Sequence, residues 1–193
     1  MAHSTRDSLI EVGLATFQTE GYTATGINEI LERAGVHKGS FYHLFPSKEA
    51  FAVAVLQAYA TAEMARWTEA FGETKLSPMK RLRKYLKLLV VLYGRSSGLS
   101  GCFLGSLCLE IADHSEEMRL QLQGVLAAWQ GALAGLLQQA KELGELSPSA
   151  KPAELAELLI AHWEGAHVRA KAEDSDRPLE LFLRFTFDVL LRA

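Results

Sequence analysis

Cysteine, proline and surplus positive charge are all scarce in this chain of 193 residues. The two cysteines, Cys102 and Cys108, form no CxxC pair and have no His-x-x-His partner nearby. We therefore expect no zinc site and, in a reducing compartment, no structural disulfide. Only five prolines are present and no segment is of low complexity, which argues against a disordered chain.

Long apolar runs are missing as well. No run is long enough to cross a bilayer, and residues 1–7 are polar and lack the apolar segment of a secretory signal. We therefore expect a cytoplasmic protein. Strand patterns are nearly absent, while hydrophobic residues make up 49% of the chain. These features predict an all-α protein with a substantial core.

The charge of the chain does not by itself suggest nucleic-acid binding. The net charge is −3, and the first 50 residues hold four lysines or arginines against six acidic residues. A DNA-binding domain is usually basic. If this segment binds DNA, its positive surface must be local, around Lys38, Lys48 and the nearby histidines. Such binding should depend strongly on salt.

Residues 27–48 nevertheless carry a specific pattern. Ile27, Ile30 and Leu31 give the apolar spacing of a short helix, which Thr25 can cap and Gly35 can end. A second short helix follows and stops at Pro46, after which Ser47 can cap a third helix. Two helices around a glycine turn, the second one short and polar, are typical of a helix-turn-helix.

The same residues resemble a known family. The stretch AGVHKGSFYHLFPSKEAF follows a run containing Ala15, Phe17, Gly21, Tyr22 and Thr25. Over residues 5–56 this pattern is similar to the DNA-binding domain of TetR-type transcriptional regulators. The resemblance implies a three-helix DNA-binding head over residues 1–48, and a helical bundle for ligand binding and dimerisation over residues 49–193.

The resemblance also assigns candidate DNA contacts. His37 stands where the family often has a capping serine or threonine, so it caps poorly but can reach a base edge, and the operator contacts stay open. Tyr22 fits either the DNA backbone or the core. The predicted DNA-binding residues are Thr25, His37, Lys38, Gly39, Ser40, Tyr42, His43 and Lys48.

Amphipathic patterns continue along the rest of the chain. They predict helices over residues 47–71, 79–93, 102–111, 118–143, 153–173 and 178–191, with a linker at 72–78 and a flexible loop at 94–101. The basic run Lys80, Arg81, Arg83, Lys84 and Lys87 can be a solvated helix face, which we favour, or a second DNA surface.

Cys102 follows Gly101 at the start of a predicted helix. Exposed backbone N–H groups there favour a thiolate, so Cys102 is a candidate reactive thiol, although a small buried side chain is the other interpretation. The segments GCFLGSLCLEIADHSEEMR and HWEGAHVRAKAEDSDRPLELF resemble the TetR branch that responds to reactive electrophiles and acrylate-like acids. That branch carries its characteristic cysteine at the Gly101-Cys102 pair.

A small-molecule pocket and a dimer interface are the remaining predictions. The pocket residues are Tyr93, Cys102, Phe103, Trp129, Trp163 and His167, and Trp129 also fits a plain core position. The last two helices are apolar on more than one face, which indicates a partner surface. The predicted interface residues are Trp163, Ala166, Phe182, Phe185 and Val189.

These patterns predict a homodimeric repressor that binds double-stranded DNA at a near-palindromic operator and is released by a small molecule or a thiol-reactive compound. Reversible binding of an aromatic or apolar effector, without cysteine chemistry, is the alternative. We expect no cofactor and no metal. An enzyme is disfavoured, because Cys102 and His114 have no third orienting group at a defined spacing. A purely structural helical dimer would leave the polar second helix unexplained.

Overall fold

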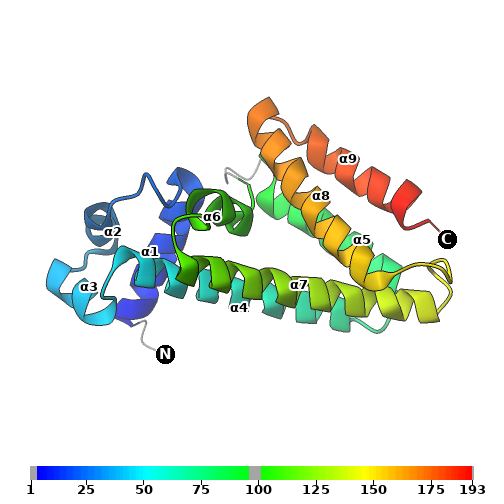
Figure 1. Ribbon diagram of the computed structural model, residues 1–193, viewed down its shortest axis with the longest axis horizontal. Helices are drawn as coiled ribbons and strands as arrows, with labels where there is room; N and C mark the ends of the chain where they lie inside the picture. Colours follow the sequence, from blue (N-terminus) through cyan, green and yellow to red (C-terminus); the bar gives the residue numbers. More distant parts are fainter. Residues whose placement is uncertain (1–3, 96–100, 193) are drawn as a thin grey trace. The chain divides into compact units, whose positions relative to one another are not determined.

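The computed structural model describes residues 4–95 and 101–192, and the regular elements in these ranges are all helical, as the fold prediction requires (Figure 1). The loop predicted at 94–101 lies mostly outside the described residues. The helices are α1 (Thr5–Glu20), α2 (Ile27–Ala34), α3 (Lys38–Leu44), α4 (Lys48–Gly72), α5 (Pro78–Tyr93), α6 (Phe103–Ile111), α7 (Glu116–Glu142), α8 (Pro152–Glu173) and α9 (Arg177–Phe185), followed by the π-helical turn η2 (Thr186–Leu190).

The chain divides into two compact units. The first contains the residues up to Glu63 together with Phe103–Gln123, and the second contains Met64–Cys102 together with the residues from Gly124 onward. Helices α4 and α7 each contribute one end to each unit. Below, the first is called the head unit and the second the bundle unit, and each is described by itself.

A cluster of phenylalanines forms the centre of the head unit. Phe41 and Phe45, from the end of α3, contact Phe51 of α4 with ring centroids 5.3 and 5.0 Å apart, and Phe17 of α1 contacts the same ring at 5.9 Å. All four side chains are buried. A helix of seven residues is too short to be stable alone, so these edge-to-face contacts hold α3 in place.

The helix ends of the head unit match several sequence predictions. Ser4 and Asp7 form a capping box at α1, Gly35 adopts the left-handed conformation after α2, and Ser47 accepts a hydrogen bond from Ala50 N–H at the start of α4. The prediction for Thr25 was wrong. Gly26 occupies the N-cap of α2, and the buried Thr25 hydroxyl instead donates to the Gly21 carbonyl at 2.6 Å.

In the bundle unit, one predicted surface residue is buried. Arg81 of α5 belongs to the run that was expected to face solvent, but its guanidinium donates to the Phe71 carbonyl and to Gln139. The last turn of α4 leaves carbonyls without helical partners, and Arg81 satisfies one of them. Ser77 precedes Pro78 as predicted, yet its side chain makes no capping bond.

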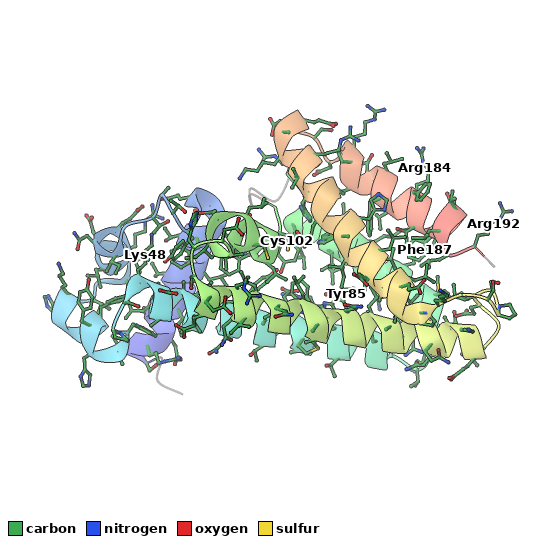
Figure 2. All side chains as sticks on the ribbon, in the orientation of Figure 1. Lys48, Tyr85, Cys102, Arg184, Phe187 and Arg192 are labelled. Atoms are coloured by element: carbon green, nitrogen blue, oxygen red, sulfur yellow. The ribbon has the colours of Figure 1, made fainter. Side chains whose placement is uncertain are left out.

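Helices α8 and α9 lie side by side at the end of the chain (Figure 1). Phe182 of α9 packs against Trp163 and His162 of α8, with centroids 5.5 and 5.1 Å apart. In η2, Phe187 lies 4.1 Å below the guanidinium of Arg83, so α5 also contacts this end of the chain (Figure 2). Helices α5, α8 and α9 therefore pack on one another in the bundle unit.

Helix α7 revises the expectation about apolar runs. By length and composition alone, Glu116–Glu142 is long enough and apolar enough to cross a membrane. Alanines and glycines between the leucines raise its mean hydropathy without forming an unbroken run. Its leucine stripe is buried in the protein, whereas Gln123, Gln138 and Gln139 are exposed, so the helix is amphipathic.

We predict that Gly13→Ala destabilises the head unit. An added Cβ would lie 2.7 Å from Phe51 Cε1 and still closer to Cζ, and the fully buried Phe51 ring has no free space to move into. Overpacking of this kind costs about 1–3 kcal/mol. Urea unfolding followed by circular dichroism measures the loss.

The control variant is Gly131→Ala. Gly131 is also helical, but a Cβ there meets no atom within 4 Å, so the free energy of unfolding should stay constant or rise by up to about 1 kcal/mol. Equal stability of the Gly13→Ala and Gly131→Ala proteins would contradict the packing described for Phe51.

Candidate DNA-binding surface and sensor site

Helix α3 presents one buried face and one exposed polar face. Phe41 is fully buried, whereas the polar positions before and along the helix are open to solvent. The Tyr42 ring is 45% exposed, and Lys38 Nζ lies 6.0 Å from its centroid. The exposed residues are His37, Lys38, Gly39, Ser40, Tyr42 and His43. Six of the eight predicted DNA-binding residues therefore share one accessible surface.

Ion pairing explains how an acidic head can carry a local positive surface. Arg33 of α2 lies 2.5 Å from Glu20 and 2.6 Å from Glu29, so two of the acidic residues of the head are paired with a cation outside α3. Lys38 takes part in no described ion pair and is exposed. The positive charge on the α3 surface thus comes from Lys38, with His37 and His43 beside it.

The other two predicted contacts point into the head. The Thr25 side chain is 1% exposed, so in this structure it cannot contact DNA directly. Lys48 Nζ donates to the Tyr22 carbonyl at 2.6 Å and lies 4.3 Å from the Tyr22 ring centroid (Figure 2). Burial lowers the pKa of Lys48, and Glu110 partly offsets this. Lys48 therefore fixes the Tyr22 segment in the structure.

Two carboxylates tie α6 and the start of α7 to the helix-turn-helix. Glu110, near the end of α6, accepts a hydrogen bond of 2.6 Å from the Thr23 backbone N–H. A Cβ on Gly21 would lie 2.9 Å from the same carboxylate. The Ser115 hydroxyl donates to Glu49 of α4 and also accepts from Met118 N–H as the predicted cap of α7. At the other end of α6, Phe103 packs on Tyr59 of α4 at 5.1 Å.

In the bundle unit, Cys102 lies beside Glu164 of α8, and the preceding Gly101 lies beside His167 of the same helix. Its thiol is 6% exposed and donates a hydrogen bond to the Glu164 carboxylate. Burial raises the pKa of Glu164, and the bond from Cys102 acts in the opposite direction. Residue 101 needs its glycine because φ is +101°. A Cβ there would make an ordinary contact of 3.6 Å with His167 Nδ1, so Gly101 lies next to His167.

His167 completes this group. Its side chain is 4% exposed, and its Nε2 has no hydrogen-bond partner in the part of the chain that the structure describes. Burial lowers the pKa of His167 to about 4, while Asp176 opposes the shift. The imidazole is therefore neutral at pH 7. The Trp163 ring lies 4.3 Å from it, centroid to centroid.

The predicted pocket residues do not form a single group. Cys102, Trp163 and His167 are neighbours, as just described. Trp129 instead stacks on Trp67 at 6.1 Å, within a separate aromatic group that includes Phe71 and Tyr85. The Tyr93 hydroxyl accepts from Arg66 at 3.0 Å. Phe103 belongs to the head unit.

The predicted interface residues divide into two sets. Trp163, Ala166 and Phe182 are buried within the chain, because α8 and α9 use them to pack on each other, so they cannot form an exposed surface. Phe185 and Val189 are 43% and 59% exposed. Further exposed apolar side chains on the same helices are Leu158, Val168 and Leu181.

Comparison with known proteins places these features in a family. Residues 9–55 match the model described as bacterial regulatory proteins, tetR family, and residues 78–186 match a tetracyclin repressor-like C-terminal domain. The chain belongs to the TetR family. It is accordingly a helix-turn-helix DNA-binding transcriptional regulator and not an enzyme.

Individual TetR-family relatives are similar to this protein over nearly its whole length. The transcriptional regulator AcuR of Cereibacter sphaeroides is 39% identical over 92% of this chain and 81% of its own length. The repressor NemR of Escherichia coli K12 is 35% identical over 92% of this chain and 89% of its own. A crystal structure of reduced E. coli NemR superposes with a TM-score of 0.89 at 33% identity, covering 97% of both chains.

Sequence reasoning missed two carboxylates of this TetR-family chain. Glu164 lies between Trp163 and Gly165 in α8, one turn before His167, and an acidic residue among apolar neighbours could have marked it. Glu110 contacts the segment around Thr23, which is 87 positions away in the sequence. No local signal predicts a contact of that separation.

We predict that Lys38→Ala weakens operator binding about tenfold and lowers the salt dependence of binding by about one phosphate contact. The reason is that Lys38 supplies the exposed charge on α3. Fluorescence anisotropy on a duplex selected from a random pool, repeated at several salt concentrations, measures both changes. The control is Lys87→Ala, which removes an exposed charge from α5. An equal effect of the two variants would favour the second DNA surface on α5.

His167 should make stability depend on pH. The unfolded chain takes up a proton near pH 6.5, whereas the buried imidazole does so only near pH 4. The contribution of His167 to the free energy of unfolding is therefore fully present above pH 6.5. It is lost as the pH falls from 6.5 to 4, and the total loss is about 3 kcal/mol. Urea unfolding between pH 4 and 7.5 measures the loss.

His167→Gln should remove this component of the pH dependence, because glutamine does not titrate. His162→Gln alters a half-buried histidine of the same helix and should retain it. If His167→Gln unfolds with the same pH dependence as the unchanged protein, the buried neutral imidazole is not its source.

Proposed function

We propose that this protein is a homodimeric, ligand-responsive repressor, released from a near-palindromic operator when a small molecule acts at Cys102. One observation carries the proposal: a buried thiol directly precedes α6, and the far end of α6 holds the helix-turn-helix through Glu110. AcuR and NemR, named as a regulator and a repressor, support the regulatory role.

The proposed DNA contacts begin from the exposed face of α3. We assign Lys38 to a phosphate or a guanine edge, Ser40 and His43 to bases or backbone, and Tyr42 to a phosphate. We assign His37, at the start of the helix, to a base edge. A two-fold dimer puts one such helix in each of two successive major grooves, which requires a near-palindromic site. A cytoplasmic location follows from this access to DNA.

The proposed dimer interface lies on the exposed apolar side chains of α8, α9 and η2. Phe185 and Val189 belong to it, and Leu158, Val168 and Leu181 extend it. Exposed apolar side chains that gather on adjacent elements favour association over solvent exposure. The buried Trp163, Ala166 and Phe182 support this surface from beneath. The division of the chain into a DNA-binding domain, residues 1–48, and a ligand-binding and dimerisation domain, residues 49–193, remains a prediction.

Induction requires an effector to favour a state that does not bind DNA. We propose that α6 is the element with two states. A change at Cys102 acts on the first turn of α6, since Phe103 follows it directly, and Glu110 in the last turn accepts from Thr23 N–H. Rotation or fraying of α6 would break this bond and release the turn before α2.

Reversible binding of an apolar or aromatic effector is the second candidate. It is supported by the aromatic group of Trp67, Phe71, Tyr85 and Trp129, whose stacked and edge-to-face rings suit contact with an apolar or aromatic molecule. This candidate needs no chemistry at Cys102.

The test compares thiol variants on bound operator. N-ethylmaleimide should release the unchanged protein and Cys108→Ser, and should leave Cys102→Ser bound, because serine lacks the nucleophilic thiol. A gel shift reports release, and intact mass reports labelling. Equal release of Cys102→Ser would remove the thiol mechanism and favour the reversible one. Failure of every variant to bind any selected duplex at low salt would remove the repressor role itself.

A further inference from the structure

The hydrogen bond between Cys102 and Glu164 joins a nucleophile to a carboxylate inside the bundle unit. The thiol is 6% exposed and donates to Glu164 of α8. The other oxygen of this carboxylate, Oε1, is buried and has no hydrogen-bond partner within residues 4–95 and 101–192. One carboxylate oxygen of Glu164 thus accepts the hydrogen bond from the thiol, and the other oxygen is not engaged by a described donor.

The surrounding groups make this pair unusual. His167, one turn further along α8, is buried and neutral at pH 7, and its Nε2 also has no partner among the described residues. Asp176 acts on His167 and accepts a hydrogen bond from the Arg95 backbone N–H, while the Arg95 side chain pairs with Asp174. None of these contacts supplies a positive charge to the Cys102–Glu164 pair.

A thiol and a carboxylate in contact, away from bulk water, cannot easily hold two negative charges. If the Cys102 proton left for solvent, a thiolate would lie against a carboxylate in a medium of low polarity, where like charges repel strongly. Transfer of the same proton to Glu164 keeps the pair at one negative charge. The two groups then titrate together as one unit that shares a proton.

We propose that Glu164 is the proton acceptor that activates Cys102, and that the sensor reacts as a thiolate beside a protonated Glu164. This inference rests on the proposed thiol chemistry and names the residue that makes it possible. The effector class it fits is an alkene conjugated to a carbonyl, which requires a nucleophile at one carbon and a proton at the next.

The addition balances within this pair. The Cys102 proton first passes to Glu164, and as the thiolate forms the S–C bond at the β-carbon the π electrons of the alkene move toward the carbonyl oxygen. The protonated Glu164 then returns the proton to the α-carbon. A thioether is formed, Glu164 is again a carboxylate, and no oxidant or reductant takes part.

The product differs from the starting state in one hydrogen bond. A thioether sulfur has no proton, so Glu164 loses the donor that it had from Cys102, and a carboxylate with one buried oxygen is left without that partner. Buried unpaired charge is strongly unfavourable. The chemistry therefore creates a reason for α8 and the segment before α6 to rearrange, in addition to the bulk of the adduct.

The test is the pH dependence of N-ethylmaleimide addition to the full-length Cys108→Ser protein, followed by intact mass and peptide mapping. A shared proton predicts a labelling rate that changes less than about threefold between pH 7 and 8.5. With Glu164→Gln the rate should rise about tenfold per pH unit, as for an ordinary thiol below its pKa, and should be at least about tenfold slower at pH 6. Glu157→Gln, an exposed glutamate of the same helix, should keep the flat profile.

The outcomes separate this inference from the proposed function. If Cys102 is not labelled in any variant, the thiol sensor itself is wrong. If Cys102 is labelled but the unchanged and Glu164→Gln proteins show the same slope, or Glu164→Gln is faster at pH 6, Glu164 is not the acceptor. Should Glu164→Gln fail to fold, a tenfold rise per pH unit in the Cys108→Ser protein alone overturns the proposal.

Discussion

The contact of Phe41 and Phe45 with Phe51 is the constraint on which DNA recognition by this protein depends. Helix α3 has seven residues and an exposed polar face, so it has little stability of its own. The three rings fix its axis against α4, and Phe17 ties α1 to the same point. Because the rings are fully or almost fully buried, the recognition surface can remain polar without losing its position.

Much of this structure could be predicted from the sequence. Local chemistry sets the helix ends: the Ser4–Asp7 capping box, the left-handed Gly35 and the Ser47 cap depend on residues within a few positions of one another. The exposed face of α3 followed from the spacing of Phe41 between polar neighbours. These features are determined within one or two helical turns, which is the range over which periodicity and capping rules apply.

The errors concern side chains whose partners are distant in sequence. Arg81 was assigned to solvent because its neighbours are basic, yet it reaches Phe71 and Gln139. Thr25 was assigned to a cap and a DNA contact, but its hydroxyl turns back to Gly21. Glu164 drew no attention, because only the packing of α8 brings it to Cys102. Burial decides the role of each of these polar groups, and burial is a property of the assembled units.

The short length of α6 has a geometric consequence. Its nine residues make about two and a half turns, and successive residues are separated by about 100° around the axis because 3.6 residues complete a turn. If α6 gains or loses one helical residue at the Cys102 end, the Glu110 carboxylate turns by more than a quarter circle relative to Thr23 N–H. The hydrogen bond between these two groups is now 2.6 Å long. The hydrogen bond between Glu110 and Thr23 is therefore either made or broken when α6 changes by one residue, and intermediate arrangements do not retain it.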